Sequence, residues 1–512
     1  MDGESPLPHS SFFLTRIRNA LSGRGAATTF GHRGSTITGA EAAALLDRLD
    51  GGLGAAGVGP DDVLAIAGGN RPETVLTQIA AQLRGAAVLL LAASAPVPDR
   101  IAALDAAAAT VLVVDPCREP ERVGPLVAAA GERTVLSLGD PPAGTRDLLG
   151  LRGTPTATPP PGVRTIFPSG GTTGRPKLIR HSSIYETMAH IFAPEPDGPR
   201  LLLVSPMSHM TGNAAVLGTL LRGGTSVLHE DFDAGAVLDA IEAERIGTLS
   251  LTPARLVRLL DHPRRPRTDT SSLSELSVGA APLPAHRLAQ ALDAFGPVLR
   301  QGYGLTEAPM VAGIAAAEFD GHPERLLSVG RIVPGMRARV VGADGTPLPA
   351  GVAGEIEVSG LAVMDGYQDE ALTAAALRDG WLRTGDLGHF DAEGYLYLLG
   401  RSGEVIVTGE HGSKVHPARL EAVLTAHPAI RQAAVFGVPG PDGELVHAVV
   451  VPASPGTPRA EDVRAWVRAE LGQDHLVPAS VEFAGTLPLT AIGKVDKRAL
   501  RASVSGPAAG HT

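Results

Sequence analysis

Short apolar runs alternate with longer segments of helical periodicity along the first half of the chain. The helical pattern is clearest at 72–83, between apolar runs at 62–67 and 86–92. Further apolar runs lie at 111–114, 134–137, 201–204, 226–229 and 248–251, and further helical patterns at 213–222 and 234–244. Apolar runs without polar alternation are typical of strands buried on both faces, and their alternation with helices predicts parallel sheets covered by helices. We therefore expect an α/β fold.

Near residue 329 the pattern changes to short strands separated by turn signals, expected at 338–341, 354–359 and 395–399. This predicts a small β-rich subdomain over about residues 329–400. After Gly400-Arg401 a compact α+β segment follows, with helices expected at 417–426 and 459–471. A chain of 512 residues is too long for one ordinary core. We expect a large N-terminal domain at 1–400, a small mobile C-terminal domain at 401–502 and a disordered tail at 503–512.

Composition and charge exclude several classes of protein. Apolar residues make up 44% of the chain and charged residues 19%, as in ordinary globular proteins. The net charge is −10 without any basic run, so nucleic acid is not expected as a partner. No signal peptide is evident, and the most apolar run, 86–97, is too short to cross a membrane. Cys117 is the only cysteine, which excludes an internal disulfide. We expect a cytoplasmic protein without membrane insertion.

Lysine is rare in this chain. Lys and Arg total 44, yet the lysines are only Lys177, Lys414, Lys494 and Lys497. Arg is a rigid planar fork, whereas Lys is a compact charge on a flexible stem. Where one ammonium must reach one oxygen, Arg is a poor replacement. Each lysine is therefore a candidate functional residue, with chance retention as the alternative.

A glycine-rich stretch has the chemistry of a polyphosphate-binding loop. It carries glycines and hydroxyls followed by one cation: Ser169, Gly170, Gly171, Thr172, Thr173, Gly174 and Lys177. Glycines let successive backbone N–H groups turn towards an anion, and the hydroxyls add donors. The lysine follows Gly-Arg-Pro, so this is not a GxxxxGK[ST] loop. A surface turn rich in Ser, Thr and Gly is the alternative for the glycine spacing alone.

The full string resembles the phosphate-binding signature of the adenylate-forming superfamily, which comprises acyl-CoA synthetases, peptide-synthetase adenylation domains and luciferases. The extra Gly171, and Leu178-Ile179 where a glycine is usual, resemble the aryl-acid-activating members. The resemblance covers essentially the whole chain. It implies activation of a carboxylic acid with ATP and Mg²⁺, giving an acyl-adenylate and pyrophosphate. By this resemblance, Lys177 steadies the pyrophosphate that leaves.

Further motifs follow in the order that the resemblance implies. Ser277–Leu283 resembles an adenine-side loop, with Gly279, Ala280 and Ala281 admitting the base. Gln301–Glu307 resembles the Tyr-Gly-x-Thr-Glu motif. By that match Tyr303 lies against adenine, next to Gly304, while Thr306 contacts the α-phosphate and Glu307 binds Mg²⁺. From the residues alone, Tyr303 would be a core aromatic and Glu307 a solvated charge.

The later motifs supply the remaining expected contacts. Asp386, in Trp381–Asp386, matches the carboxylate that accepts hydrogen bonds from the ribose hydroxyls. Arg401 matches the start of the hinge and is expected near the ribose. Lys494 matches the C-terminal lysine that bridges the carboxylate and the α-phosphate, and we expect Lys497, unlike Lys494, to be dispensable for adenylation. His209 lies where related enzymes carry a residue of the acyl pocket, with a structural histidine as the alternative.

The acceptor of the acyl group is less well indicated, because the hinge departs from the Gly-Arg-x-Lys-Asp pattern. This chain has Ser402-Gly403-Glu404 after Arg401, and the loop 408–417 is longer than usual. CoA is the expected co-substrate. An amine, as in an amide synthetase, and a carrier protein are the alternative acceptors, and a non-catalytic nucleotide-binding protein is the alternative from another class. The acid itself is open between small aromatic and other acyl acids.

Overall fold

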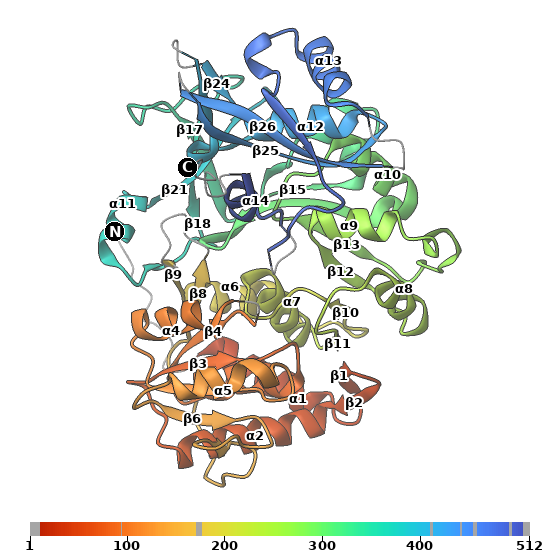
Figure 1. Cartoon of the computed structure of the whole chain (residues 1–512). Coiled ribbons are helices and arrows are strands. Elements are labelled where there is room, and N and C mark those ends of the chain that lie inside the picture. The colour runs from red at the N-terminus through yellow and green to blue at the C-terminus, as the bar shows by residue number, and fades with distance from the viewer. Residues whose placement is uncertain are drawn as a thin grey trace, which may run out of the picture.

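Apolar strands buried on both faces form the inner parts of two large sheets, which confirms the expected α/β class. The computed structural model describes residues 11–93, 95–169, 177–409, 413–440, 443–453, 458–490 and 494–504. Figure 1 shows the first part of the chain, coloured red to green, building these two sheets with their helices. The C-terminal part, coloured blue, builds its own small sheet and helices beside them.

The eight-stranded sheet has the order β19-β9-β8-β4-β3-β5-β6-β7. Its strands are β3 (Val63–Ala67), β4 (Ala87–Leu91), β5 (Val111–Val114), β6 (Thr134–Ser137), β7 (Arg146–Asp147), β8 (Arg164–Ser169), β9 (Lys177–His181) and β19 (Gly366–Tyr367). The inner strands run parallel, and parallel neighbours need a crossover connection. The crossovers are α3 (Pro72–Leu83), α4 (Val97–Ala106) and α5 (Pro120–Ala128).

The nine-stranded sheet has the order β16-β15-β14-β13-β12-β10-β11-β1-β2. Its strands are β1 (Thr28–His32), β2 (Ser35–Thr38), β10 (Arg200–Leu203), β11 (Thr225–Leu228), β12 (Thr248–Leu251), β13 (Glu275–Gly279), β14 (Leu299–Leu305), β15 (Ala308–Ala315) and β16 (Arg331–Ile332). The crossovers are α7 (Met210–Leu221), α8 (Ala234–Ala243), α9 (Pro253–Leu260) and α10 (Ala285–Phe295). The antiparallel pair β14–β15 departs from the expected alternation, because the two residues between the strands leave no room for a crossover helix.

One apolar core lies between the two large sheets. It joins side chains of β3 and β4 with side chains of β10, around the helices α1 (Phe12–Gly23), α2 (Gly39–Ala55), α3, α6 (Ser183–Ile191) and α7. The opposite face of the eight-stranded sheet packs against α4 and α5, and that of the nine-stranded sheet against α8, α9 and α10. Burial on both faces explains why the strands read as continuous apolar runs.

The remaining strands form three smaller sheets. The β-rich part contains β17 (Met336–Val341), β18 (Gly354–Gly360), β20 (Leu377–Arg378), β21 (Trp381–Phe390) and β22 (Leu396–Arg401), with α11 (Glu370–Ala376) beside it. The C-terminal part contains the hairpin of β23 (Ile406–Thr408) and β24 (Ser413–Val415), and a sheet of β25 (Ile430–Gly440), β26 (Gly443–Pro452) and β27 (Ser480–Phe483). Its helices are α12 (Pro417–Ala426), α13 (Ala460–Leu471) and α14 (Lys497–Val504).

Helix α14 corrects the expected start of the disordered tail. Ser503 and Val504 are helical, because Leu500 of the same helix is buried against Phe436 of β25 and gives this segment an apolar contact to fold on. Residues 505–512 of the expected tail lie outside the described residues. Helix α7 also starts earlier than expected, at Met210, with His209 as its N-cap residue.

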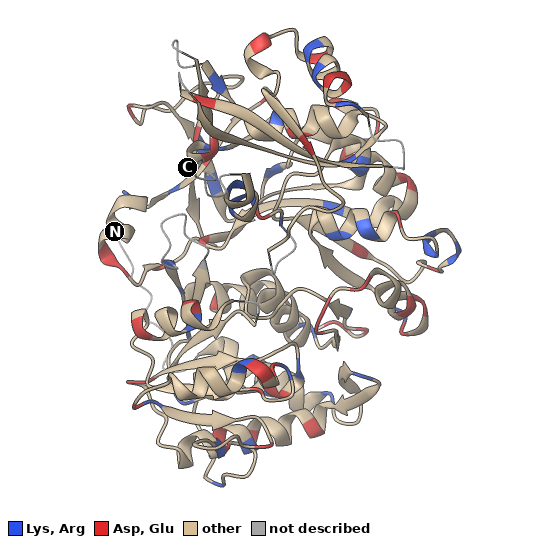
Figure 2. Ribbon diagram, viewed as in Figure 1, with Lys and Arg blue, Asp and Glu red and all other residues tan. Residues whose placement is uncertain are grey.

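The structure bears on two expectations from the sequence, which concern membrane-spanning segments and the distribution of charge. Within the described ranges, no helix is long and apolar enough to cross a membrane. Figure 2 shows Lys and Arg interspersed with Asp and Glu across the ribbon, without a large area of one sign in this view.

The inner strands should be intolerant of lost volume. Leu89 lies in β4 at 0% exposure, so Leu89→Ala is expected to reduce the free energy of unfolding by about 2–5 kcal/mol through lost burial and a cavity. Denaturant unfolding followed by circular dichroism measures this. Leu327→Ala removes a leucine that is 62% exposed and should cost less than about 0.5 kcal/mol. Equal effects of the two substitutions would contradict the assignment of this core.

Candidate active site

Asp386 is a nearly buried carboxylate that is paired from its neighbouring strand β22 and from β14 of the nine-stranded sheet. Its side chain is 11% exposed, the Tyr303 hydroxyl donates to its Oδ2 at 2.6 Å, and Arg401 Nε lies 2.7 Å from its Oδ1. Register explains the second contact, since Asp386 of β21 lies opposite Arg401 at the end of β22. Burial raises the pKa of Asp386, whereas Arg401 and the Tyr303 hydrogen bond lower it. Unpaired, such a carboxylate would be strongly disfavoured here.

Thr306 and Glu307 form the turn between β14 and β15. Side chains of β9 and of its neighbour β19 contact this turn. His181 at the end of β9 donates from Nε2 to the Thr306 carbonyl at 2.7 Å. The Tyr367 hydroxyl donates to Glu307 Oε1 at 2.9 Å, and Lys177 Nζ lies 5.4 Å from the centre of the Tyr367 ring. Burial lowers the pKa of His181 and favours the neutral ring, in which Nε2 carries the donated proton and Nδ1 can only accept. One short strand thus connects Lys177 to the Thr306 turn.

Lys494 lies in the electrostatic field of the same carboxylates. Burial and then Arg401 lower the pKa of Lys494, while Asp386, Glu307 and Glu404 raise it. Its backbone closes a turn with Thr490, which donates from its N–H to the Lys494 carbonyl at 2.7 Å. Residues 491–493 within this turn lie outside the described part of the chain. The charge of the C-terminal lysine is thus within electrostatic range of Asp386 on β21, Arg401 on β22 and Glu307 in the turn between β14 and β15.

His209 faces Lys494 from the start of α7. Burial first, and then the positive charges of Lys494 and Arg255, lower the pKa of His209 to about 4. Its Nε2 is buried and has no hydrogen-bond partner among the described residues. A neutral imidazole with one free nitrogen can accept or donate one hydrogen bond to a ligand at neutral pH.

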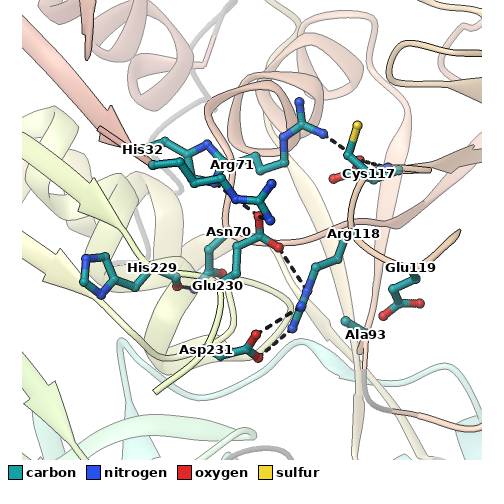
Figure 3. Close-up of polar contacts among 12 residues, drawn as sticks. His32, Asn70, Arg71, Ala93, Cys117, Arg118, Glu119, His229, Glu230 and Asp231 are labelled. Carbon is teal, nitrogen blue, oxygen red and sulfur yellow. Dashed lines mark hydrogen bonds and ion pairs between the residues drawn. The ribbon is translucent and has the colours of Figure 1, made fainter. Parts of the chain in front are cut away.

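The loop before His209 is held by Asn70, which follows β3. Asn70 Oδ1 accepts from the Met207 N–H at 2.9 Å, and its Nδ2 donates to the carbonyls of Ser205 and His229 at 3.1 and 2.8 Å. Figure 3 shows Asn70 beside His229, between segments that leave the two large sheets. One amide side chain thus fixes the path that the backbone takes to His209.

A group of charged side chains lies around Asn70 and the segments that it joins. Glu230 pairs with His32 Nε2 at 3.2 Å and with Arg118 Nε at 3.1 Å, and Arg118 also binds both oxygens of Asp231. Figure 3 shows these side chains converging from separate segments. They all follow the carboxyl ends of parallel strands, the edge at which open α/β sheets bind ligands. The charges hold the two sheets in register at that edge.

The small residues of the expected adenine-side loop are explained by close backbone packing. Gly279 ends β13, and a Cβ built there would lie 2.7 Å from the Gly302 carbonyl oxygen. A Cβ on Gly304 would lie 2.3 Å from the Pro309 carbonyl oxygen. Ala280 adopts φ +71°, a backbone conformation that L-residues other than Asn and Asp rarely adopt, and Ala281 follows it.

The glycine-rich loop itself falls largely outside the described residues. Ser169 ends β8 and lies opposite Lys177, which begins β9, so the loop joins two antiparallel strands. The expected phosphate-binding residues Gly170, Gly171, Thr172, Thr173 and Gly174 lie outside the described part of the chain. Lys177 is placed by β9 towards Tyr367 and the Thr306 turn.

Comparison with known proteins agrees with this arrangement. Residues 18–368 match the model of the AMP-binding enzyme family, and residues 419–494 match that of the AMP-binding enzyme C-terminal domain. The chain belongs to the AMP-binding enzyme family. This confirms the resemblance to adenylate-forming enzymes that the motifs indicated, including a large N-terminal and a small C-terminal domain.

Three similar proteins illustrate the range of this family. A feruloyl-CoA synthase from Amycolatopsis sp is 36% identical over 93% of this chain and 95% of its own length. The structure of the amide bond synthetase McbA from Marinactinospora thermotolerans has a TM-score of 0.86 and 35% identity, covering 96% of this chain and all of that one. MenE, the O-succinylbenzoate CoA synthetase of Bacillus subtilis, in complex with ATP and magnesium ion, has a TM-score of 0.81 and 26% identity, covering 97% and 99% of the two chains.

The structure of this AMP-binding enzyme also shows site neighbours that sequence reasoning missed. Asn70, His181 and Tyr367 each fix a segment that carries an expected site residue. Tyr367 could have been noticed, since the chain has only 5 tyrosines. Nothing in the local sequence of Asn70 or His181 marks them, because their partners lie far away along the chain.

The Tyr303 hydroxyl should contribute to folding through Asp386. Tyr303→Phe leaves one oxygen of a buried carboxylate without its donor, so we expect a loss of about 1–3 kcal/mol in the free energy of unfolding. Differential scanning calorimetry and denaturant titration measure this. The control is Tyr397→Phe, which removes a hydroxyl that lies 3.3 Å from the more accessible Asp391. We expect it to reduce the free energy of unfolding by less than about 1 kcal/mol. If Tyr303→Phe leaves the free energy of unfolding unchanged, Asp386 does not need this donor.

Proposed function

We propose that this chain activates a carboxylic acid with ATP and then transfers the acyl group to the thiol of CoA. The observation that carries the proposal is the pairing of the buried Asp386 with Arg401 and Tyr303, within electrostatic range of Lys494 and Glu307. The resemblance of the motifs assigns these residues to one nucleotide site. The family match and the feruloyl-CoA synthase relative support the same reaction.

The first step joins two anions, so charge neutralisation and positioning should dominate catalysis. A carboxylate oxygen of the acid attacks the α-phosphorus of ATP, the new O–P bond forms, and the bond to pyrophosphate breaks. We assign to Lys494 the role of neutralising the attacking carboxylate and the α-phosphate, and to Thr306 a hydrogen bond to that phosphate. Lys177 and the 169–174 loop would hold the departing pyrophosphate.

The ribose and the base would be held on the β14 side of the site. Asp386 offers carboxylate oxygens to the ribose hydroxyls and carries no donor that would compete. Arg401 would stay near the ribose through its ion pair with Asp386. We place adenine near Gly279, Ala280 and Ala281, with Tyr303 and Gly304 beside it. A ribose hydroxyl that binds Asp386 would share the carboxylate with the Tyr303 hydroxyl.

Mg²⁺ fits the donor set as a companion of ATP. Glu307 is the carboxylate expected to bind it, and the described residues contain no group of three or more His, Cys, Asp or Glu side chains that could hold a metal. Mg²⁺ in phosphate-transfer sites commonly has one or two carboxylates and completes its shell with phosphate oxygens and water. A single carboxylate is therefore sufficient, and the bound ion would neutralise the phosphates.

The second step would follow a rotation of the small C-terminal domain. We place the boundary at Gly400-Arg401, with the β-rich part from about residue 329 to 400 in the large domain, because β22 ends there and the match to the C-terminal domain model begins soon after. His209, held neutral, would line the acyl pocket. Its free nitrogen could hydrogen-bond an oxygen of the acid.

Adenylation is tested by acid-dependent exchange of labelled pyrophosphate into ATP, over a panel of aromatic and aliphatic acids. Lys494→Ala should reduce exchange by about 10²–10³-fold, because it removes the charge that offsets two anions in the transition state. Arg468→Ala, which removes one half of an exposed ion pair with Asp474, should leave the rate unchanged. Wild-type protein without exchange for any acid would contradict the proposal. The acid that gives the highest rate defines the substrate class.

An amide synthetase is the second candidate, and the McbA structure favours it because it matches this chain over almost its whole length. Incubation with ATP, the best acid and either CoA or a panel of primary amines separates the two. We expect a CoA thioester, identified by mass spectrometry, at a rate at least about 10-fold above amide formation. Amide without thioester would replace CoA by an amine as acceptor and leave the adenylation step intact.

A further inference from the structure

Lys497 is a nearly buried cation held by two carboxylates. Its Nζ lies 2.8 Å from Glu421 Oε1 and 3.2 Å from Glu404 Oε2, and its side chain is 18% exposed. Glu404 belongs to the short helical turn η5 (Ser402–Glu404), and Glu421 lies on α12. Glu421 Oε1 also accepts from the Val435 N–H at 2.8 Å. We name Glu404, Lys497 and Glu421 the ion triad.

The position of Lys497 is unfavourable without these partners. It begins α14, and a cation at a helix N-terminus opposes the helix dipole. Burial alone would lower its pKa, but Glu421 and Glu404 raise it above the ordinary value. A lysine retained at such a place, in a chain with so few lysines, indicates that the carboxylates need it.

The ion triad lies next to both cations that face Asp386. Glu404 comes just after Arg401, which pairs with Asp386, and Lys497 comes just after Lys494. Between Lys494 and Lys497, Asp496 closes the turn, donating its N–H to the Pro488 carbonyl at 2.8 Å and accepting from Ala499 N–H at 2.9 Å. The two backbone segments that carry Arg401 and Lys494 are therefore tied together by Lys497.

Glu404 has a second cation within its electrostatic reach. Its carboxylate is among the groups that raise the pKa of Lys494, together with Asp386 and Glu307. Without Lys497, the Glu404 carboxylate would be left beside Lys494 with its former partner gone. Glu404 is 41% exposed, so water would offset part of this loss, but Lys494 would remain the cation within its electrostatic range.

We propose that Lys497 is a positioning residue for adenylation, which holds Glu404 away from Lys494. The inference rests on the proposed function, because it assigns Lys494 to the adenylation step. It is an alternative to the expectation from the sequence that Lys497 is dispensable. Lys497→Ala is therefore unsuitable as a silent control for Lys494→Ala.

The test compares Lys497→Met with the double variant Lys497→Met/Glu404→Gln. Pyrophosphate exchange is measured at saturating ATP and acid. The rate is divided by the concentration of active sites, which is titrated with a non-hydrolysable acyl-sulfamoyl adenosine, so that misfolded protein does not contribute. Lys497→Met should lower the rate at least about 10-fold, through misplacement of Lys494. The double variant should return to within about threefold of wild type, because the competing carboxylate has been removed. Arg468→Met, which removes a cation from an exposed pair in the same region, should have no effect.

The possible results separate three conclusions. Unchanged exchange per active site in Lys497→Met would overturn the inference. A double variant as slow as Lys497→Met, or slower, would overturn it too, and would give Lys497 a purely structural role. Absence of exchange in the wild-type protein would contradict both the proposed function and the inference. If the wild type shows exchange and Lys494→Ala abolishes it while Lys497→Met does not lower it, the inference alone is contradicted.

Discussion

Much of the site's geometry depends on the burial of one carboxylate. Asp386 lies on an inner strand of the β-rich sheet, where an unpaired charge would be strongly unfavourable. Its two oxygens are occupied by the Tyr303 hydroxyl and the Arg401 guanidinium. The first contact ties the β-rich sheet to β14 of the nine-stranded sheet, and the second sets the direction in which the chain leaves β22 for the C-terminal part. A requirement of charge pairing thus fixes how three parts of the molecule meet.

The contrast between arginine and lysine follows the kind of partner that each must satisfy. Arginines in this chain bind several backbone carbonyls at once, as Arg16 does with Ala189, Phe192 and Leu221. A planar group with several donors suits such contacts. Lys494 and Lys497 instead place one ammonium among carboxylates in confined positions. These two lysines therefore lie where a fork of donors would be too large or too rigid, whereas Lys414 on β24 is exposed.

Sequence reasoning worked best where local signals decide the structure. Helix α3 was expected with its observed bounds, because Pro72 begins it and Gly85, with φ +79°, follows its end. The order of motifs also selected Asp386 and Arg401, which the structure pairs. The contacts between Tyr303 and Asp386, and between Tyr367 and Glu307, could not be predicted, since they join residues 83 and 60 positions apart. Only the packing of separate sheets brings such pairs together.

Acceptor choice is a separate problem from adenylation. A feruloyl-CoA synthase and an amide bond synthetase match this chain over nearly its full length at 36% and 35% identity. A CoA synthase and an amide bond synthetase are thus nearly equally similar to it, so these two likenesses support the shared adenylation step more than either acceptor. The residues around Asp386 serve the first step, which both reactions require. Selection between a thiol and an amine must then depend on residues that meet the acyl-adenylate after that step. The segment from Ser402 onwards, where the hinge departs from the usual pattern, is the place where such a difference can arise without loss of adenylation.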